Sequence, residues 1–177
     1  MLPSQERARL EACILPHLDA AYNLSRWLLR DPVDAEDVTQ EALLRAYRFF
    51  GGFRGGDARA WLLQIVRNCC YTWMQNNRPG VALDELPEGS FASDESTPEA
   101  AAFASVDAGR VKRALEELPA HFREIFVLRE LEGCSYKEIA AITSHPIGTV
   151  MSALARARKQ LKAALSESQQ KEVRRAL

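Results

Sequence analysis

The stretch GCSYKEIAAITSHPIGTVMSALARARKQL, residues 133–161, decides the fold class of this chain. Apolar residues recur at helical spacing on both sides of a short polar turn, Ser144-His145-Pro146. The proline suits the start of the second helix, because its missing N–H costs nothing in the first helical turn. A short helix, a tight turn and a longer helix are typical of a helix-turn-helix unit. The predicted buried seams are Tyr136, Ile139, Ala140 and Thr143, and then Ile147, Val150, Met151, Leu154, Leu161 and Leu165, with Arg158 interrupting the second.

The opposite face of the second predicted helix is polar and cationic. Small side chains near its start suit base edges in the major groove of DNA, whereas the cations further along suit phosphates. This face therefore predicts DNA binding, and an ordinary amphipathic hairpin with a solvated basic face is the alternative. The predicted DNA-facing residues are Thr149, Ser152, Arg156, Arg158 and Lys159, with Ala153 on the same face and Lys162 among the phosphate-binding cations.

Helical spacing also recurs upstream, and no segment shows a useful length of strand alternation. We therefore expect an all-α protein. The upstream apolar stripes are Leu10, Ile14, Leu18, Ala21 and Leu28; Val38, Ala42, Ala46, Phe49 and Phe50; Leu62, Ile65, Val66, Cys69 and Trp73; and Val111, Leu115, Leu118, Phe122, Ile125 and Phe126.

The breaks between these stripes divide the chain. Asp31-Pro32 ends the first helical pattern, and Asp34 is the predicted N-cap of the next helix. Four glycines around Phe53 and Arg54 predict a flexible loop before the third helix.

A change of composition marks the domain boundary. Pro79-Gly80 ends the third helix, and residues 79–109 carry acidic residues but no Lys or Arg and few large apolar groups. This composition predicts a flexible acidic linker. We expect two small helical domains, 1–78 and 110–165, followed by a polar C-terminal tail, 166–177.

Composition restricts the class of protein. The chain has 177 residues, of which 47% are hydrophobic and 27% charged, as in globular proteins. It has no apolar run of the roughly 20 residues needed to cross a membrane, and its N-terminus lacks the pattern of a secretion signal. We expect a cytoplasmic protein without direct membrane insertion.

The residues that carry covalent chemistry are scattered. The four cysteines form no CxxC pair, and three histidines lie far apart. Cys13 and His17 could present two metal ligands on one helical face, but a small buried thiol beside a surface histidine is the favoured interpretation. Neither an HExxH motif nor a glycine-rich phosphate loop after a strand occurs. We expect no enzyme activity, no cofactor and no metal.

Two faces of the first domain differ in chemistry. The third helix combines an aromatic residue with amides and arginines, which could stack and hold unpaired bases or could simply be solvated. The second helix has an acidic face, which would repel DNA and so predicts protein binding, with a solvated helix surface as the alternative. The mixed stripe is Gln64, Asn68, Tyr71, Gln75 and Arg78 with Arg67 beside it, and the acidic face includes Glu36, Asp37, Gln40, Glu41 and Arg45.

The order of three segments is specific. They are DAEDVTQEALLRAYRFFGGFRGG at 34–56, ARAWLLQIVRNCCYTWMQ at 58–75 and ALEELPAHFREIFVLRELEGCSYKEIAAITSHPIGTVMSALARARKQL at 114–161. Together they resemble the bacterial sigma factors of the extracytoplasmic-function (ECF) group of the sigma-70 family. The likeness extends over about residues 10–165.

This resemblance implies a role for each part of the chain. The region Asp34–Arg48 would bind core RNA polymerase at the clamp helices. The loop Phe53–Asp57 and the helix Arg59–Arg78 would open and read the −10 promoter element, and Pro146–Lys159 would read the −35 element. The linker would run toward the RNA exit path. The implied core-binding residues are Asp34, Glu36, Asp37, Gln40, Glu41 and Arg45, and the implied −10 residues are Phe53, Arg54, Arg67, Asn68, Tyr71, Gln75 and Arg78.

The resemblance also implies partners and leaves an alternative. Family members bind core polymerase and promoter DNA, and an anti-sigma factor commonly holds them inactive. A helix-turn-helix regulator that binds DNA without acting as a sigma factor is the alternative. The chain departs from the family pattern at Thr72, Gln75, Asn76, Asn77, Ser144, Met151 and Ala153.

Overall fold

The computed structural model describes residues 4–78 and 107–176, and these residues form helices and short connections without a strand. The prediction of an all-α fold is confirmed. The elements are α1 (Ser4–Ile14), η1 (Leu15–His17), α2 (Leu18–Leu29), α3 (Pro32–Phe49), η2 (Phe50–Gly52), α4 (Ala58–Asn77), α6 (Ala108–Glu117), α7 (Ala120–Phe126), η3 (Val127–Leu131, a π-helical turn), α8 (Tyr136–Thr143) and α9 (Ile147–Ala176).

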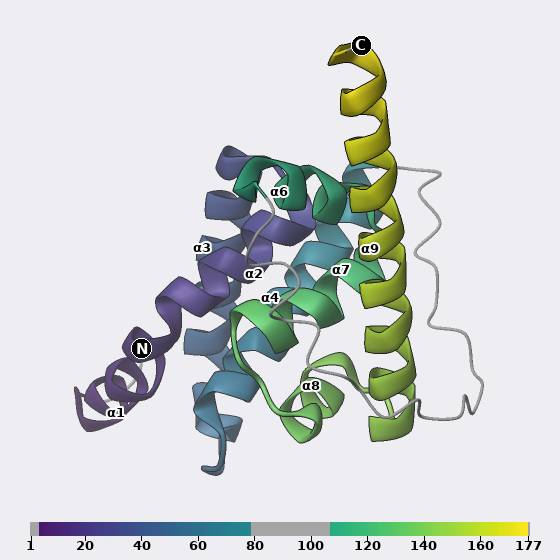
Figure 1. Cartoon of the computed structure of the whole chain (residues 1–177). Helices are drawn as coiled ribbons and strands as arrows, with labels where there is room; N and C mark the ends of the chain where they lie inside the picture. Colours follow the sequence, from purple (N-terminus) through teal and green to yellow (C-terminus); the bar gives the residue numbers. More distant parts are fainter. Residues whose placement is uncertain (1–3, 79–106, 177) are drawn as a thin grey trace.

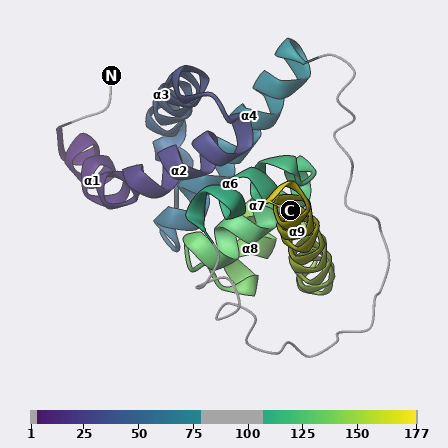
Figure 2. The same cartoon turned by 45° about the horizontal axis from the view of Figure 1, so that its top comes forward.

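Two helical bundles lie against each other. Helices α2, α3 and α4 pack together in the N-terminal half, and α6, α7 and α8 pack against α9 in the C-terminal half. Helix α4 also packs on α8, and α2 packs on α7, so the halves share an interface. In Figures 1 and 2, α1 and α3 lie on one side of the molecule and α9 on the opposite side. The division at 79–109 stays a prediction, because residues 79–106 lie outside the described part.

The first apolar stripe does not belong to one helix. Helix α1 ends at Ile14, a short 3-10 turn follows, and α2 begins at Leu18. Pro16 has no N–H to donate and sits in the first turn of the 3-10 segment, where that loss is tolerated. The expectation of a continuous helical pattern up to Leu28 is therefore wrong.

The start of α3 also differs from the prediction. Its N-cap is Asp31, whose carboxylate accepts hydrogen bonds from the N–H groups of Val33 and Asp34 at 2.8 and 3.1 Å. The predicted N-cap at Asp34 is wrong, because Pro32 already has the backbone geometry of a first helical residue. Before this cap, Arg30 ends α2 in the left-handed conformation with φ 70°.

The glycine-rich loop before α4 is anchored by aromatic packing. The Phe53 ring lies 4.9 Å from the Trp61 ring and 5.8 Å from the Phe50 ring, between centroids. Gly55 and Gly56 then turn the chain with φ of 92° and 102°, values that favour glycine. Asp57 caps α4, with its carboxylate accepting from the N–H of Ala60 at 3.0 Å. Only part of this loop is thus free of side-chain packing.

The helix-turn-helix prediction is confirmed in its outline. Ser135 and Glu138 form a capping box at the start of α8. The helix ends at Ser144, which adopts the left-handed conformation with φ 58°. Helix α9 follows at once, with the N–H of Val150 donating to the Pro146 carbonyl at 3.1 Å.

The buried seam of α9 is rotated from the predicted one. Ile147 and Met151 are exposed at 46% and 37%, whereas Ala153, predicted on the DNA face, is buried. The two small residues Ala153 and Ala157 allow α9 to approach its neighbours closely, and these small contacts carry a weaker sequence signal than a large apolar residue. The seam is Val150, Ala153, Leu154, Ala157, Leu161 and Leu165.

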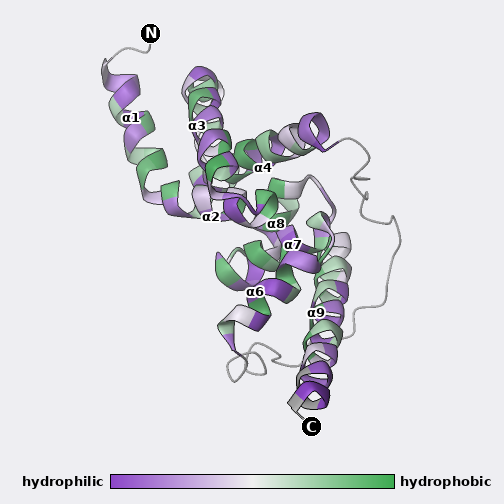
Figure 3. Ribbon diagram, turned by 90° about the horizontal axis from the view of Figure 1, so that it is seen from above, coloured by the Kyte–Doolittle hydropathy of each residue, from purple (hydrophilic) through white to green (hydrophobic). Residues whose placement is uncertain are grey.

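Both ends of the C-terminal half extend beyond the predicted boundaries. Helix α6 begins at Ala108, so the predicted linker 79–109 overlaps its first turn. Helix α9 continues through the predicted polar tail to Ala176, and its far end is mainly hydrophilic (Figure 3). No helix within the described residues is long and apolar enough to cross a membrane.

The thiols differ in expected reactivity. Burial raises the pKa of Cys70 to about 12 and that of Cys134 to about 11, whereas Cys13 is partly exposed. Because the thiolate is the nucleophile, we expect Cys13 to react with a chromogenic disulfide reagent in the native protein, and Cys70 and Cys134 only after unfolding. Cys13→Ser should remove the fast phase. A fast phase that persists in this variant would contradict the buried positions of the other thiols.

Candidate nucleic-acid interface

The predicted DNA-binding face of α9 combines short polar groups with cations. Thr149, Ser152 and Arg156 are partly buried, and Lys159 is exposed. The Ser152 hydroxyl donates to the Thr149 carbonyl at 3.1 Å, which leaves its oxygen lone pairs able to accept from a ligand. These four residues lie on neighbouring turns of one helix, as the sequence predicts.

Arg158 lies apart from that group. Its Nε donates to Glu130 Oε1 at 3.1 Å and its Nη2 contacts the same oxygen. Both side chains are about one-fifth exposed, at 19% and 20%. The ion pair joins α9 to η3, so the Arg158 guanidinium is engaged within the C-terminal half. The spacing pattern placed Arg158 in the seam, and its anionic partner could not be seen from spacing alone.

The outer face of α3 carries most of the predicted polymerase-binding residues. Glu36, Asp37, Gln40 and Glu41 are exposed, and Asp34 and Arg45 are partly buried. Arg45 Nε donates to Glu41 Oε1 at 2.7 Å within the helix. The pKa of Arg45 is raised mainly by this hydrogen bond.

Three large apolar residues share the surface of α3 with this acidic group. Val33, Leu44 and Phe49 are exposed at 63%, 54% and 64%. Val33 and Leu44 fall in register with Asp37 and Gln40 at helical spacing, so one face mixes apolar and anionic groups. Exposed apolar residues on a polar-rimmed face are typical of a protein-binding surface. The prediction that Phe49 belongs to the apolar stripe of this helix is wrong, since its side chain is largely exposed, and patterning assigned no role to Val33 and Leu44. The reason is that a buried stripe and an exposed one have the same period.

The predicted −10 residues lie on the mixed stripe of α4, called the α4 stripe below, and on the loop before it. They are only partly accessible. Asn68, Gln75 and Arg54 are exposed, whereas Arg67, Tyr71, Arg78 and Phe53 are partly buried. The Arg67 guanidinium lies over the Tyr71 ring, 4.4 Å from its centroid. Arg78 donates to the Leu29 carbonyl at 2.9 Å and so anchors the end of α4 to the end of α2.

A carboxylate from the other half meets this stripe. Glu124 of α7 forms an ion pair with Arg67, 2.5 Å between Oε1 and Nε, and accepts from the Tyr71 hydroxyl at 2.9 Å through Oε2. Burial raises the pKa of Glu124, and burial with the neighbouring Glu124 charge raises the pKa of Tyr71. Sequence spacing carries no sign of this partner, because it lies 53 residues from Tyr71 along the chain.

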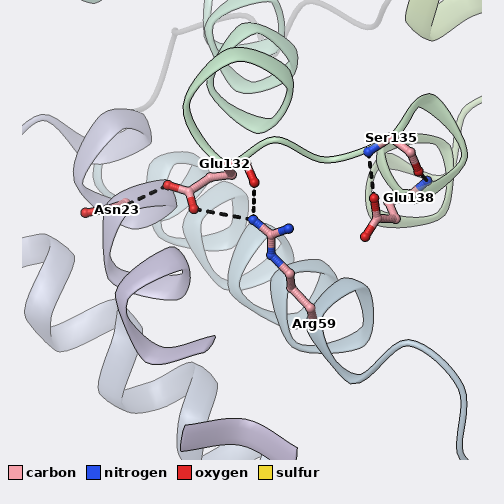
Figure 4. A network of polar contacts seen from close by, with 5 residues as sticks. All are labelled: Asn23, Arg59, Glu132, Ser135 and Glu138. Carbon is pink, nitrogen blue, oxygen red and sulfur yellow. Dashed lines mark hydrogen bonds and ion pairs between the residues drawn. The ribbon is translucent and has the colours of Figure 1, made fainter. Parts of the chain in front are cut away.

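A second polar group joins the halves near the start of α4. Figure 4 shows Glu132 between Asn23 of α2 and Arg59 of α4. Asn23 donates to Glu132 Oε1 at 3.3 Å, and Arg59 lies 3.6 Å from Glu132 Oε2 while donating to the Glu132 carbonyl. The nearby Ser135 and Glu138 form the α8 capping box.

The described residues offer no ligand set for a metal. No three or more His, Cys, Asp or Glu side chains gather in a metal-binding group within 4–78 and 107–176. Cys13 and His17 lie in different elements, α1 and η1, and not on one helical face as the spacing allowed.

Comparison with known proteins agrees with this two-part geometry. The family model "Sigma-70 region 2" matches residues 13–79, and "Sigma-70, region 4" matches residues 108–161. The RNA polymerase sigma-H factor of Pseudomonas aeruginosa is 37% identical over 146 residues, which cover 77% of this chain and 76% of that protein. The chain belongs to the sigma-70 family. We refer to its two halves as region 2 and region 4.

Further relatives place the chain in the ECF group of that family. The ECF RNA polymerase sigma-E factor of Escherichia coli K12 is 36% identical over 137 residues, 72% of each chain. The ECF sigma factor SigE of Mycolicibacterium smegmatis is 34% identical over 148 residues, which cover 82% of this chain and 57% of that protein. This chain therefore spans little more than half the length of the mycobacterial relative.

Two solved structures have the same fold. The sigma factor RpoE of Bartonella quintana, in complex with the anti-sigma factor NepR, matches with a TM-score of 0.67 and 30% identity, covering 86% of this chain and 94% of that chain. CnrH in complex with the cytosolic domain of CnrY matches with a TM-score of 0.65 and 24% identity, covering 91% and 90%.

The Arg158–Glu130 pair generates a stability prediction. We expect Arg158→Ala to lower the free energy of unfolding by about 1–2 kcal/mol, because the largely buried Glu130 carboxylate loses its partner. The neighbouring exposed Lys159→Ala is the matched control and should change it by less than about 0.5 kcal/mol. Urea unfolding followed by circular dichroism measures both. Equal, small effects would mean that Arg158 is not structural.

Proposed function

We propose that this sigma factor binds core RNA polymerase through α3, opens and reads the −10 element with α4 and its preceding loop, and reads the −35 element with α9. The observation that carries the proposal is the order of these surfaces within one chain of the sigma-70 family. A DNA-binding regulator would need only the helix-turn-helix. The α3 face and the α4 stripe favour the sigma function over that alternative.

The α3 face supports polymerase binding by its chemistry. Asp37, Gln40 and Glu41 are exposed on the turns of α3 that precede the exposed Leu44. The face can therefore bury apolar area on a partner while its anions meet cations of that partner. Burying one large apolar side chain contributes about 1.5–3 kcal/mol. The anions add specificity and speed of association more than affinity. They also disfavour DNA at this face.

The α4 stripe supports capture of a separated strand. Exposed amides at Asn68 and Gln75 can pair with base edges, and the cations Arg54 and Arg67 can hold phosphates. Stacking of a base on an aromatic ring contributes about 1–3 kcal/mol, which offsets the cost of breaking a base pair. The Tyr71 ring is the aromatic group in this stripe. Region 2 thus stabilises an open strand without covalent chemistry.

The α9 face supports reading of duplex DNA. Thr149 and Ser152 lie near its N-terminal end, where a recognition helix meets base edges, and Arg156 and Lys159 follow at phosphate positions. We propose that the protein works in the cytoplasm as a non-enzymatic subunit, and that polymerase performs nucleotide addition. The structures of similar sigma factors with anti-sigma factors support control of this chain by such an inhibitor.

Separate variants of α3 and α9 test these roles. Arg156→Ala should lower transcription from a −35-dependent promoter by about tenfold or more, because a hydrogen bond to a charged group contributes about 1.5–3 kcal/mol, and should leave core binding unchanged. Asp37→Ala with Gln40→Ala should lower core binding in a pull-down. In that double variant, transcription should recover when core polymerase is raised.

The two variants control for each other. Both substitutions lie on the outer surface of a helix, so general unfolding would lower both readouts in both proteins. Loss of both activities in each variant, with normal circular dichroism, would contradict the division of roles. DNA binding without any core complex in the wild type would favour the regulator alternative.

A further inference from the structure

The DNA-facing stripe of α4 is engaged inside the molecule. Glu124 lies in region 4, yet its two carboxylate oxygens contact Arg67 and Tyr71 of region 2. The Glu124 side chain is 1% exposed and that of Arg67 is 17% exposed. An anion from one half thus sits on the cation and hydroxyl that the other half would offer to DNA.

A carboxylate in this place resembles a phosphate in charge and in hydrogen-bonding capacity. Both present anionic oxygens that accept from an arginine and from a hydroxyl. The Arg67 guanidinium also covers part of the Tyr71 ring at 4.4 Å from the centroid. While Glu124 is in place, the Arg67 charge is neutralised and the Tyr71 hydroxyl donates its hydrogen bond to the carboxylate. Arg67 at the same time covers one face of the Tyr71 ring.

Three further contacts hold the same arrangement. Gln64 of α4 donates to the Ser144 hydroxyl of the helix-turn-helix at 3.4 Å. Arg59 pairs with Glu132, and Arg123 of α7 donates to the Leu28 carbonyl at 3.3 Å. All of them join region 2 to region 4, so they are made together or lost together.

Promoter geometry makes this arrangement incompatible with simultaneous binding. The −10 and −35 elements are about 25 base pairs apart, which is about 85 Å at 3.4 Å per base pair. In this structure the α4 stripe and the helix-turn-helix touch through Gln64 and Ser144. The two regions must separate before both can lie on one duplex.

We propose that Glu124 is an internal competitor of promoter DNA: its carboxylate occupies the Arg67–Tyr71 site for a backbone phosphate of the −10 strand, and promoter binding requires its release. This proposal rests on the proposed role of α4. It gives region 4 a second task, which is to cover region 2 when no promoter is bound. It also makes the contact between the regions part of the control of this sigma factor.

The contact is suited to release because its charges are poorly solvated. The Glu124 side chain is 1% exposed and that of Arg67 is 17% exposed, so both charges lose most of their hydration when they form the contact. A buried ion pair of this kind gives little net stability, because desolvation offsets most of the attraction. A DNA phosphate that remains partly in water can therefore replace the carboxylate at small cost.

Binding of a labelled single-stranded −10 oligonucleotide by the full chain, without polymerase, tests the competition. We expect Glu124→Gln to bind about fivefold more tightly than the wild type or better, as coupling energies between sites commonly produce. The amide preserves size and can still pair with Tyr71. The dependence of the logarithm of affinity on that of salt concentration should stay close to that of the wild type, because Arg67 neutralises the same phosphate in both bound complexes.

Two variants serve as controls for the loss of a negative charge and for the role of Arg67. Glu11→Gln makes the same change of charge in an exposed pair with Arg7 within α1, and should bind like the wild type. Glu124→Gln combined with Arg67→Ala should lose the gain in affinity, and its salt dependence should be shallower by about 0.7 because one phosphate contact is gone. If Glu124→Gln binds no more tightly than Glu11→Gln, the competition is refuted.

A crosslink provides a second test that does not depend on the fold tolerating a change at Glu124. In a Cys13→Ser background, Asn23→Cys and Glu132→Cys, which join the two halves outside the proposed DNA-binding residues, are linked by a short thiol crosslinker. We expect the joined chain to lose the oligonucleotide and the promoter complex, whereas Asn23→Cys capped with N-ethylmaleimide keeps both. A joined chain that binds as well as the capped one would refute the proposal.

The same variants separate this proposal from the proposed function. If Arg67→Ala and Tyr71→Ala leave −10 opening by the holoenzyme unchanged, measured by permanganate reactivity of unpaired thymines, then α4 is not the −10 surface. If they abolish opening and Glu124→Gln has no effect on oligonucleotide affinity, the proposed function stands and the competition alone fails.

Discussion

The packing of α4 on both halves of the molecule is the constraint on which the rest of the structure depends. Its apolar side, with Leu62 and Val66, forms the core of region 2 with α2 and α3. Its polar side, with Arg67 and Tyr71, meets α7 and α8 of region 4. Because α4 is one helix, these sides cannot move independently. Arg67 and Tyr71, which we propose to face DNA, can be freed from Glu124 only if the two regions separate.

Two neighbouring charged residues of α7, Arg123 and Glu124, contact region 2 in different ways. Burial lowers the pKa of Arg123 to about 10, yet the guanidinium donates to three carbonyls, including Leu28 of α2. Glu124 instead meets a cation and a hydroxyl on α4. For both charges, the cost of leaving water offsets much of the attraction to their partners. The interface therefore positions the two regions in a defined way but needs little net free energy, which suits the opening that we propose.

Local patterns predicted well where a single element carried the information. The helix-turn-helix could be placed because turn chemistry and apolar spacing agree over residues 135–161. The seam of α9 was misplaced by part of a turn, since Ala153 and Ala157 are too small to signal burial. The cap of α3 was misplaced because Asp31 and Asp34 both precede plausible helix starts. Such choices depend on backbone geometry that composition does not contain.

The sequence by itself determined the all-α class, the order of the helices and the family, because periodicity, turn residues and segment order are local or linear properties. Only the tertiary structure decided which predicted DNA-facing residues are accessible. Arg158 is held by Glu130, and Arg67 and Tyr71 are held by Glu124. The physical reason is that a charged residue shows its sign in the sequence but not its partner, and these partners come from distant elements brought together by packing.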